Sequence, residues 1–220
     1  MFEQLLQTIV LGLIQGLAEW LPVSSTAHLI VAEHFLNITA TPLFRVVLHV
    51  GTLVVVVFYF RKDVRNILSA LVHLEFNSEY GQLIPLIIVA TIPTAIIGLL
   101  YAKFLEDILQ TFILAIGITF LVGATIVYIS KIGKENTDMI TYTRALIMGA
   151  AQGFAVFPGL SRSGITISSA LLLGLKREKA FKFSFLLSIP AIIGDLIVEA
   201  YKESGQLGIQ GNALSDLIIA

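Results

Sequence analysis

The sequence predicts an all-α integral membrane protein, a polytopic helical bundle that forms a single membrane domain over residues 1–220. Hydrophobic residues make up 56% of the chain and charged residues only 13%, and the mean hydropathy is +0.90. Such a composition is typical of chains that fold in lipid. Long apolar runs, residues 83–100 and 112–129, approach the ~20 residues that a helix needs to cross about 30 Å of hydrocarbon. We therefore expect a multi-pass protein of the cell membrane.

Hydropathy and helix-breaking residues divide the chain into spans and shorter segments. The apolar segments 23–37 and 161–175 are too short to cross and are predicted to be re-entrant helices. Residues 62–81 carry several charges, which favours an interfacial helix and a loop. No cleavable signal peptide precedes the first span, so residues 4–20 are expected to be retained. The spans are expected near residues 3–20, 43–60, 82–102, 110–131, 143–157 and 181–201, with a last one beginning near residue 213.

The distribution of lysine and arginine predicts the orientation of these spans, because cytoplasmic ends carry an excess of both residues. Leaving Arg162 aside, ten basic residues fall at one set of span ends and three at the other. This split puts the amino terminus outside, with the first short segment entering from outside and the second from inside. The larger set is Arg61, Lys62, Arg65, Lys131, Lys134, Arg144, Lys176, Arg177, Lys179 and Lys182, and the smaller set is Arg45, Lys103 and Lys202.

An internal similarity supports this inverted arrangement. GLIQGLAEWLPVSSTAH near residue 12 and GAAQGFAVFPGLSRSG near residue 149 share Gly, Gln, Gly, Ala, Pro and Ser at an offset of about 137 residues. Inverted repeats, here about 3–60 and 143–201, bring their helix breaks together in one cavity near the bilayer midplane. Small residues at helix contacts are an alternative explanation. That alternative leaves Glu19, His28 and Arg162 unexplained, and ionisable residues in membrane segments are candidates for function.

The first helix break is preceded by a candidate metal site. Gln15 and Glu19 are four residues apart, so they share one face of a helix and offer oxygen ligands to a hard divalent cation, Mg²⁺ or Ca²⁺. Two ligands leave a coordination sphere that water and substrate phosphate would complete. The alternative is a buried pair that bonds only to its helix neighbours.

Pro22 ends this helix, and hydroxyls and an imidazole follow it. If a new helix begins near Ser24 or Ser25, its free amides attract an anion, and Thr26 lies in the same turn. His28 is three residues beyond Ser25 and could take the proton of that hydroxyl, the minimal arrangement for an activated nucleophile. Alternatively, Ser25 caps the helix and His28 bonds within the core.

The second break, FPGLSRSGIT, concentrates hydrogen-bond donors where a helix begins. Arg162 offers a planar, permanently charged fork that matches phosphate oxygens, although a structural arginine bonded to carbonyls is the alternative. Among the other histidines, His49 is left as a candidate that faces the cavity, while His34 and His73 are given no role. The expected phosphate-binding residues of this segment are Ser161, Arg162, Ser163, Gly164 and Thr166.

These motifs resemble the undecaprenyl-diphosphate phosphatase family, which is also known for bacitracin resistance. The resemblance rests on QGLAEWLPVSSTAH and PGLSRSGIT, and it extends to LHVGTLVVVVFYFRKD and FSFLLSIPAIIGDLI. It implies that Glu19 and Gln15 hold the metal and that Ser25 and His28 take part in the attack, while Ser161, Arg162 and Thr166 bind diphosphate. Gln15 is the less acidic of the two residues that the family uses. Family members continue past the position of Ala220, so we expect the chain to stop within a span.

The resulting prediction is an enzyme that converts undecaprenyl diphosphate to the monophosphate and inorganic phosphate, which recycles the lipid carrier of cell-wall synthesis. The cavity is expected to open to the outer face, with Ser25 as the preferred nucleophile and water or His28 as alternatives. The expected partners are the lipid substrate and the membrane, and homodimerisation is left open. A net charge of -1 gives no reason to expect nucleic acid. The rival functions are a lipid-phosphate flippase or anion transporter, and an inactive partner subunit.

Overall fold

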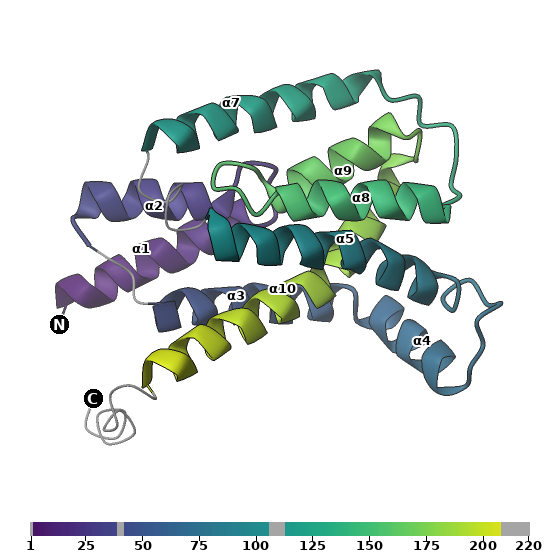
Figure 1. Ribbon diagram of the computed structural model, residues 1–220, viewed down its shortest axis with the longest axis horizontal. Coiled ribbons are helices and arrows are strands. Elements are labelled where there is room, and N and C mark those ends of the chain that lie inside the picture. Colours follow the sequence, from purple (N-terminus) through teal and green to yellow (C-terminus); the bar gives the residue numbers. More distant parts are fainter. Residues whose placement is uncertain (1, 39–41, 106–112, 208–220) are drawn as a thin grey trace.

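A computed structural model describes residues 2–38, 42–105 and 113–207 of the chain, and in this part every regular element is a helix (Figure 1). The predicted spans agree with the observed helices to within a few residues, except that the last described helix is longer. The expected span near residue 213 lies outside the described residues. The elements are α1 Phe2–Ala18, α2 Ser25–Leu36, α3 Pro42–Tyr59, α4 Arg61–Val72, α5 Leu83–Phe104, α7 Ile113–Ile129, a short 3₁₀ turn Ser130–Ile132, α8 Tyr142–Phe154, α9 Arg162–Leu172 and α10 Arg177–Leu207.

Among the described helices, three are long and apolar enough to cross a bilayer: Leu83–Phe104, Leu114–Ile132 and Arg177–Tyr201. Two shorter apolar helices, Leu5–Ala18 and Val47–Tyr59, accompany them. Large hydrophobic side chains on these helices are exposed, as expected where lipid replaces water. The prediction of an all-helical membrane protein is therefore confirmed.

The helix α10 begins four residues earlier than predicted and continues through Pro190. An internal proline removes one backbone hydrogen bond, but membrane helices tolerate this loss because neighbouring helices support the freed carbonyl. The helix α10 packs against α3, α5 and α9. The region predicted as an interfacial helix and loop forms α4 followed by turns.

The helices α1 and α2 are joined by one loop, and α8 and α9 are joined by another. The two loops meet near the middle of the molecule in Figure 1. The helices α1 and α2 extend from this point toward the end where the amino terminus lies. The helices α8 and α9 extend toward the opposite end. The helix α8 packs along α5, while α9 contacts α7, α8 and α10. The core between these helices holds Ala90, Met148, Phe183 and Leu187.

At that opposite end, ion pairs join the beginning of α10 to the loops beside it. Lys176 pairs with Asp138 at 2.5 Å, and Arg177 pairs with Glu135 at 2.5 Å. The contacts lie among the basic residues of the larger set, which the sequence analysis predicts to be cytoplasmic. Lys179 with Glu79 and Lys182 with Asp63 form two further pairs here.

The contact between α5 and α8 depends on Gly149. A Cβ atom at this position would lie 2.0 Å from the backbone oxygen of Ala90, and Thr94 Oγ1 also donates a hydrogen bond to the Gly149 carbonyl at 2.7 Å. We expect Gly149→Ala to destabilise the fold by about 1–3 kcal/mol, because the two backbones must separate. The midpoint of thermal unfolding in detergent measures this. Gly117→Ala is the control, since nothing lies within 4 Å of its Cβ position, and equal midpoints for both variants would contradict the prediction.

Candidate active site

The first loop, residues 19–24, is held from one side by an aromatic contact. The ring of Trp20 stacks on Phe185 of α10 at a centroid distance of 5.0 Å and meets Tyr59 edge-on. At the end of the loop, Ser24 has a φ of 61°, which is strained for a residue other than glycine. This backbone turn starts α2 at Ser25, so Ser24 precedes the helix and Ser25 is its first residue. The alternative in which Ser25 caps the helix is therefore wrong.

The second loop, residues 155–161, contacts the first one directly. The amide of Gly159, which has a φ of 103°, donates to Ser24 Oγ at 3.2 Å. In return, Ser161 Oγ donates to the carbonyl of Leu21 at 3.3 Å. A Cβ atom on Gly164 would lie 2.9 Å from Pro22 Cβ, so only glycine permits this approach. Segments more than 130 residues apart in sequence thus form one structural unit.

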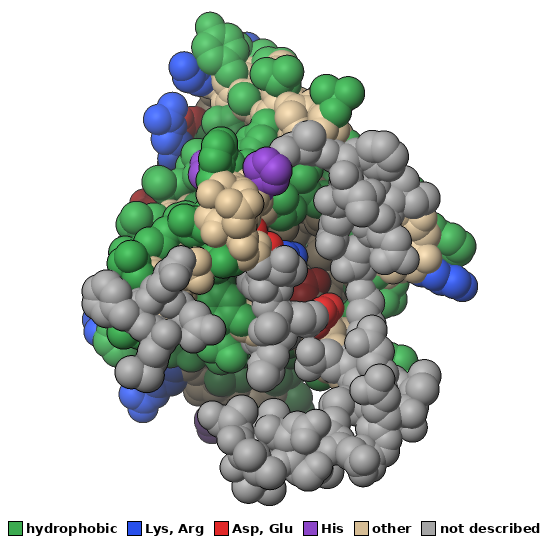
Figure 2. Space-filling view, turned by 90° about the vertical axis from the view of Figure 1, so that its left-hand side faces the viewer, with side chains coloured by type: hydrophobic (Ala, Val, Ile, Leu, Met, Phe, Trp, Pro, Cys, Tyr) green, Lys and Arg blue, Asp and Glu red, His purple; other side chains and the backbone are tan. Residues whose placement is uncertain are grey.

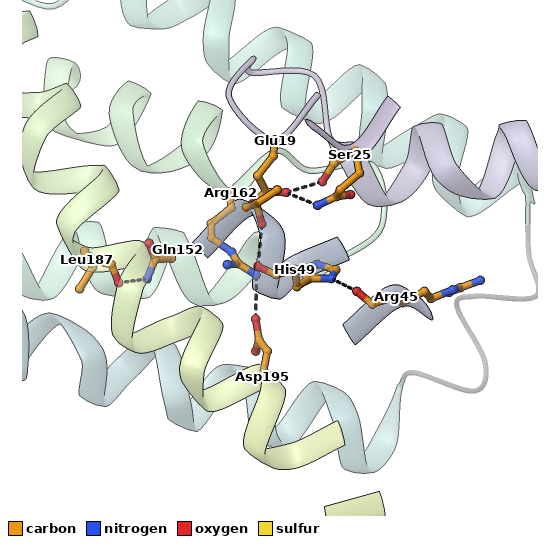
Figure 3. A network of polar contacts seen from close by, with 10 residues as sticks. Glu19, Ser25, Arg45, His49, Gln152, Arg162, Leu187 and Asp195 are labelled. Atoms are coloured by element: carbon orange, nitrogen blue, oxygen red, sulfur yellow. Dashed lines mark hydrogen bonds and ion pairs between the residues drawn. The ribbon is translucent and has the colours of Figure 1, made fainter. Parts of the chain in front are cut away.

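Gln15, Glu19 and Ser25 form a hydrogen-bonded cluster at this junction, and Figure 3 shows the Glu19 and Ser25 side chains pointing toward one another. Gln15 Nε2 donates to Glu19 Oε2 at 3.0 Å, and Ser25 Oγ donates to the same oxygen at 2.7 Å. The carboxylate is therefore placed to accept the proton of the serine hydroxyl. The predicted pairing of Ser25 with His28 is not what the structure has.

The cluster fits a divalent cation held by few protein ligands. Gln15 is 1% exposed, and its Oε1 atom is buried without a hydrogen-bond partner. A buried oxygen of this kind is costly unless a cation or water satisfies it. In the described part of the chain, no group of three or more His, Cys, Asp or Glu side chains could hold a metal ion. Gln15 Oε1 and the Glu19 carboxylate are the two oxygen ligands that this cluster could offer to a cation, and water and phosphate oxygens would have to complete the shell.

Arg162 is the first residue of α9 and lies at the same junction. Its Nη2 atom donates to Asp195 Oδ2 of α10 at 2.7 Å, whereas Nη1 is buried without a partner. The observed partner of Arg162 is thus a carboxylate, and the alternative in which this arginine bonds to carbonyls is wrong. Ser161 caps α9 because its Oγ accepts the amide of Gly164 at 3.2 Å.

Two adjoining cavities meet at these residues. A small polar one of about 30 Å³ is lined by Glu19, Ser25, Ser161 and Arg162, among others. A larger, mostly apolar one of about 480 Å³ runs between α5 and α10. Thr26, His49, Ala155 and Arg162 line both cavities. Figure 2 shows acidic and basic side chains near the centre of the end of the molecule that includes the amino terminus.

Three predicted phosphate-binding residues lie behind this junction and do not line either cavity. Thr166 is fully buried, and its Oγ1 donates to the carbonyl of Arg162 at 2.7 Å. Ser163 Oγ contacts Ser161 and loop carbonyls, and Gly164 packs on Pro22. The observed contacts of these three residues hold the two loops in place, and none of the three faces either cavity.

The two histidines nearest the loops lie in different surroundings. His28 Nδ1 donates to the Ser24 carbonyl at 2.8 Å, and its ring meets Phe120 edge-on in a separate cavity of about 190 Å³. His49 Nδ1 donates to the carbonyl of Arg45 at 2.8 Å. A neutral imidazole bonded in this way keeps its lone pair on Nε2. His49 lines the same two cavities as Arg162, and Figure 3 shows the two side chains near one another.

Comparison with known proteins places these residues in a family context. Residues 8–220 match the model of the bacitracin resistance protein BacA family. The chain belongs to this family. An undecaprenyl-diphosphatase of Korarchaeum cryptofilum is 41% identical to the chain over 206 residues, which cover 89% of this chain and 77% of the relative.

Two bacterial relatives show a similar level of identity. Undecaprenyl-diphosphatase 3 of Bacillus cereus is 43% identical over 198 residues, covering 88% of this chain and 73% of the relative. Undecaprenyl-diphosphatase of Carboxydothermus hydrogenoformans is 41% identical over 197 residues, covering 88% and 72%. The BacA-family match spans both loops, so the residues at the junction lie within the region that defines membership.

Proposed function

We propose that this BacA-family protein is a membrane phosphatase that hydrolyses undecaprenyl diphosphate, or a closely similar polyprenyl diphosphate, to the monophosphate and inorganic phosphate. The observation that carries the proposal is the polar junction of the two loops. Glu19, Ser25 and Arg162 line one small cavity there, and this cavity adjoins a larger apolar one. The names of the relatives identify the substrate class. Recycling of the lipid carrier and bacitracin resistance follow from this activity.

The polar cavity supplies positive charge where a transferring phosphoryl group develops negative charge. Arg162 presents an unpartnered Nη1 that could donate to a phosphate oxygen. The amides that begin α2 and α9 meet at the same loops, and helix N-termini favour anions. Gln15 and Glu19 would hold a divalent cation, which supplies further charge neutralisation when bound. Preorganised donors of this kind contribute the largest electrostatic part of catalysis.

Ser25 is the proposed nucleophile. Its Oγ attacks the terminal phosphorus while its proton passes to Glu19 Oε2, which already accepts it at 2.7 Å. A P–O bond to Ser25 forms, and the bond to the bridging oxygen breaks. Polyprenyl monophosphate leaves with the electron pair, and the proton can follow it from Glu19. Water then cleaves the phosphoserine and releases inorganic phosphate.

The proposed part of His28 in proton transfer requires a change from the observed conformation. Its Nδ1 atom is bonded to the Ser24 carbonyl and Ser25 Oγ is bonded to Glu19, so both side chains would have to leave these partners. We therefore assign the first proton transfer to Glu19. His28 remains a candidate for the later step in which water attacks.

The helices and the two cavities also have a proposed orientation in the bilayer. We assign α2 and α9 as re-entrant helices of two inverted repeats, supported by the opposite directions of the α1–α2 and α8–α9 pairs (Figure 1). The prenyl tail would occupy the larger apolar cavity. The ion-paired basic end would lie in the cytoplasm, so the head group would enter from the outer face.

Phosphate release from farnesyl diphosphate by the purified protein in detergent tests this function. We expect steady release in Mg²⁺ or Ca²⁺ and a loss of most of it in EDTA, because the Gln15–Glu19 pair would lose its cation. Restoring the metal should restore the rate. A folded protein that releases no phosphate but moves lipid phosphate across vesicles would instead be a transporter, and one with neither activity would fit an inactive subunit.

A further inference from the structure

Asp195 is the acidic partner of Arg162, a role that the sequence analysis does not assign to it. It lies in the second half of α10, and its Oδ2 atom accepts Nη2 of Arg162 at 2.7 Å. The Asp195 side chain is 55% exposed, whereas that of Arg162 is 22% exposed. The contact joins the beginning of α9 to α10, and both residues line the larger cavity. Figure 3 shows Asp195 reaching toward the arginine from α10.

The ion pair occupies only one of the two terminal nitrogens of the Arg162 guanidinium. Nη2 is occupied by Asp195, while Nη1 is buried without a partner. An arginine side chain has many rotamers, and fixing it in one of them costs conformational entropy. If Asp195 fixes the guanidinium before the substrate arrives, the side chain has already lost this entropy in the free protein, and substrate binding no longer has to supply it. A phosphate oxygen can then bind at Nη1 without displacing the carboxylate.

We propose that Asp195 is a positioning residue, which holds Arg162 so that Nη1 is presented to the phosphate of the substrate. This inference rests on the proposed function, because it names how the phosphate-binding arginine of that site is oriented. The competing role is that of an anion that occupies Arg162 until substrate displaces it. The two roles predict opposite signs. Removing a positioning residue weakens phosphate binding and turnover, whereas removing a competing anion strengthens phosphate binding.

Asp195→Asn and Asp195→Ala in the full chain test the proposal. We expect kcat/KM for farnesyl diphosphate to fall about tenfold in Asp195→Ala, and less in Asp195→Asn, whose amide oxygen can still accept Nη2. Asp138→Ala is the matched control, because Asp138 pairs with Lys176 at 2.5 Å and is 52% exposed, but lies at the other end of the molecule. This control should retain wild-type kcat/KM.

A double-mutant cycle separates positioning from a general structural effect. In an Arg162→Lys background, Asp195→Ala should change kcat/KM by less than about twofold, because the fork it would orient is gone. A tenfold loss in both backgrounds would overturn the proposal, since Asp195 would then act independently of Arg162. A higher kcat/KM in Asp195→Asn would also overturn it.

Binding of pyrophosphate distinguishes a failure of this inference from a failure of the proposed function. If the wild-type protein bound pyrophosphate but released no phosphate from a lipid diphosphate, the catalytic proposal would fail alone. The dissociation constant for pyrophosphate, measured by calorimetry in detergent, should still rise about tenfold in Asp195→Ala. An unchanged or lower constant, with Asp138→Ala unchanged, would contradict the positioning role.

Discussion

Arg162→Ala is expected to lower the rate of phosphate release by at least about 10²-fold, because a donor to the charge of the transition state is removed. The structure supports a large effect, since Nη1 is buried and lacks a protein partner. Turnover of farnesyl diphosphate by the purified variant measures the loss. Arg162→Lys should recover only part of the rate, because an ammonium keeps the charge and loses the planar fork.

Arg144→Ala is the control for this experiment. Arg144 lies in the first turn of α8 and donates to the carbonyls of Met139 and Leu173, away from the polar cavity. It should retain the wild-type rate if the variant is folded. Wild-type-like turnover in Arg162→Ala would refute the role assigned to this arginine.

Ser25→Ala is expected to lower the turnover rate by about 10²-fold or more, at least as much as Arg162→Ala, because the nucleophile itself is removed. A second readout is covalent, since a rapidly quenched reaction of the wild-type protein should contain phosphoserine at residue 25. The variant should contain none. Retained turnover in Ser25→Ala would make water or His28 the nucleophile instead.

Ser188→Ala controls for the loss of a buried hydroxyl. Both serines are 8% exposed. Ser188 Oγ donates to the Phe185 carbonyl at 2.7 Å, which equals the length of the Ser25–Glu19 contact. A large loss confined to Ser25→Ala therefore reflects chemistry at residue 25.

The sequence was a good guide to the helices because apolar length and helix breakers act locally. Pro22 and the Pro158–Gly159 pair predicted the breaks, and α2 and α9 begin just beyond them. The span predicted at 181–201 already ran through Pro190, but α10 extends beyond both of its predicted ends, because the polar residues there lack the apolar signal by which a span is recognised. The meeting of the two loops was predicted from the shared motif, and direct contacts now join them.

Side-chain partners within the candidate site were less predictable. A spacing of three residues put His28 within reach of Ser25, yet the backbone turn at Ser24 gives both residues other partners. Asp195 could not be assigned from sequence, because its contact with Arg162 depends on how α10 packs against α9. The only local signal was a carboxylate in an apolar segment, which is a general indication of function.

We propose above all that two loops from distant parts of the chain form one phosphate site. A crystal structure of the protein with pyrophosphate and Mg²⁺ tests it most directly. We predict pyrophosphate at the junction of the two cavities, bonded to Arg162, with Glu19 and Gln15 as the residues that would hold the cation. Pyrophosphate bound elsewhere, or Glu19 and Arg162 on separate surfaces with lipid between them, would contradict it.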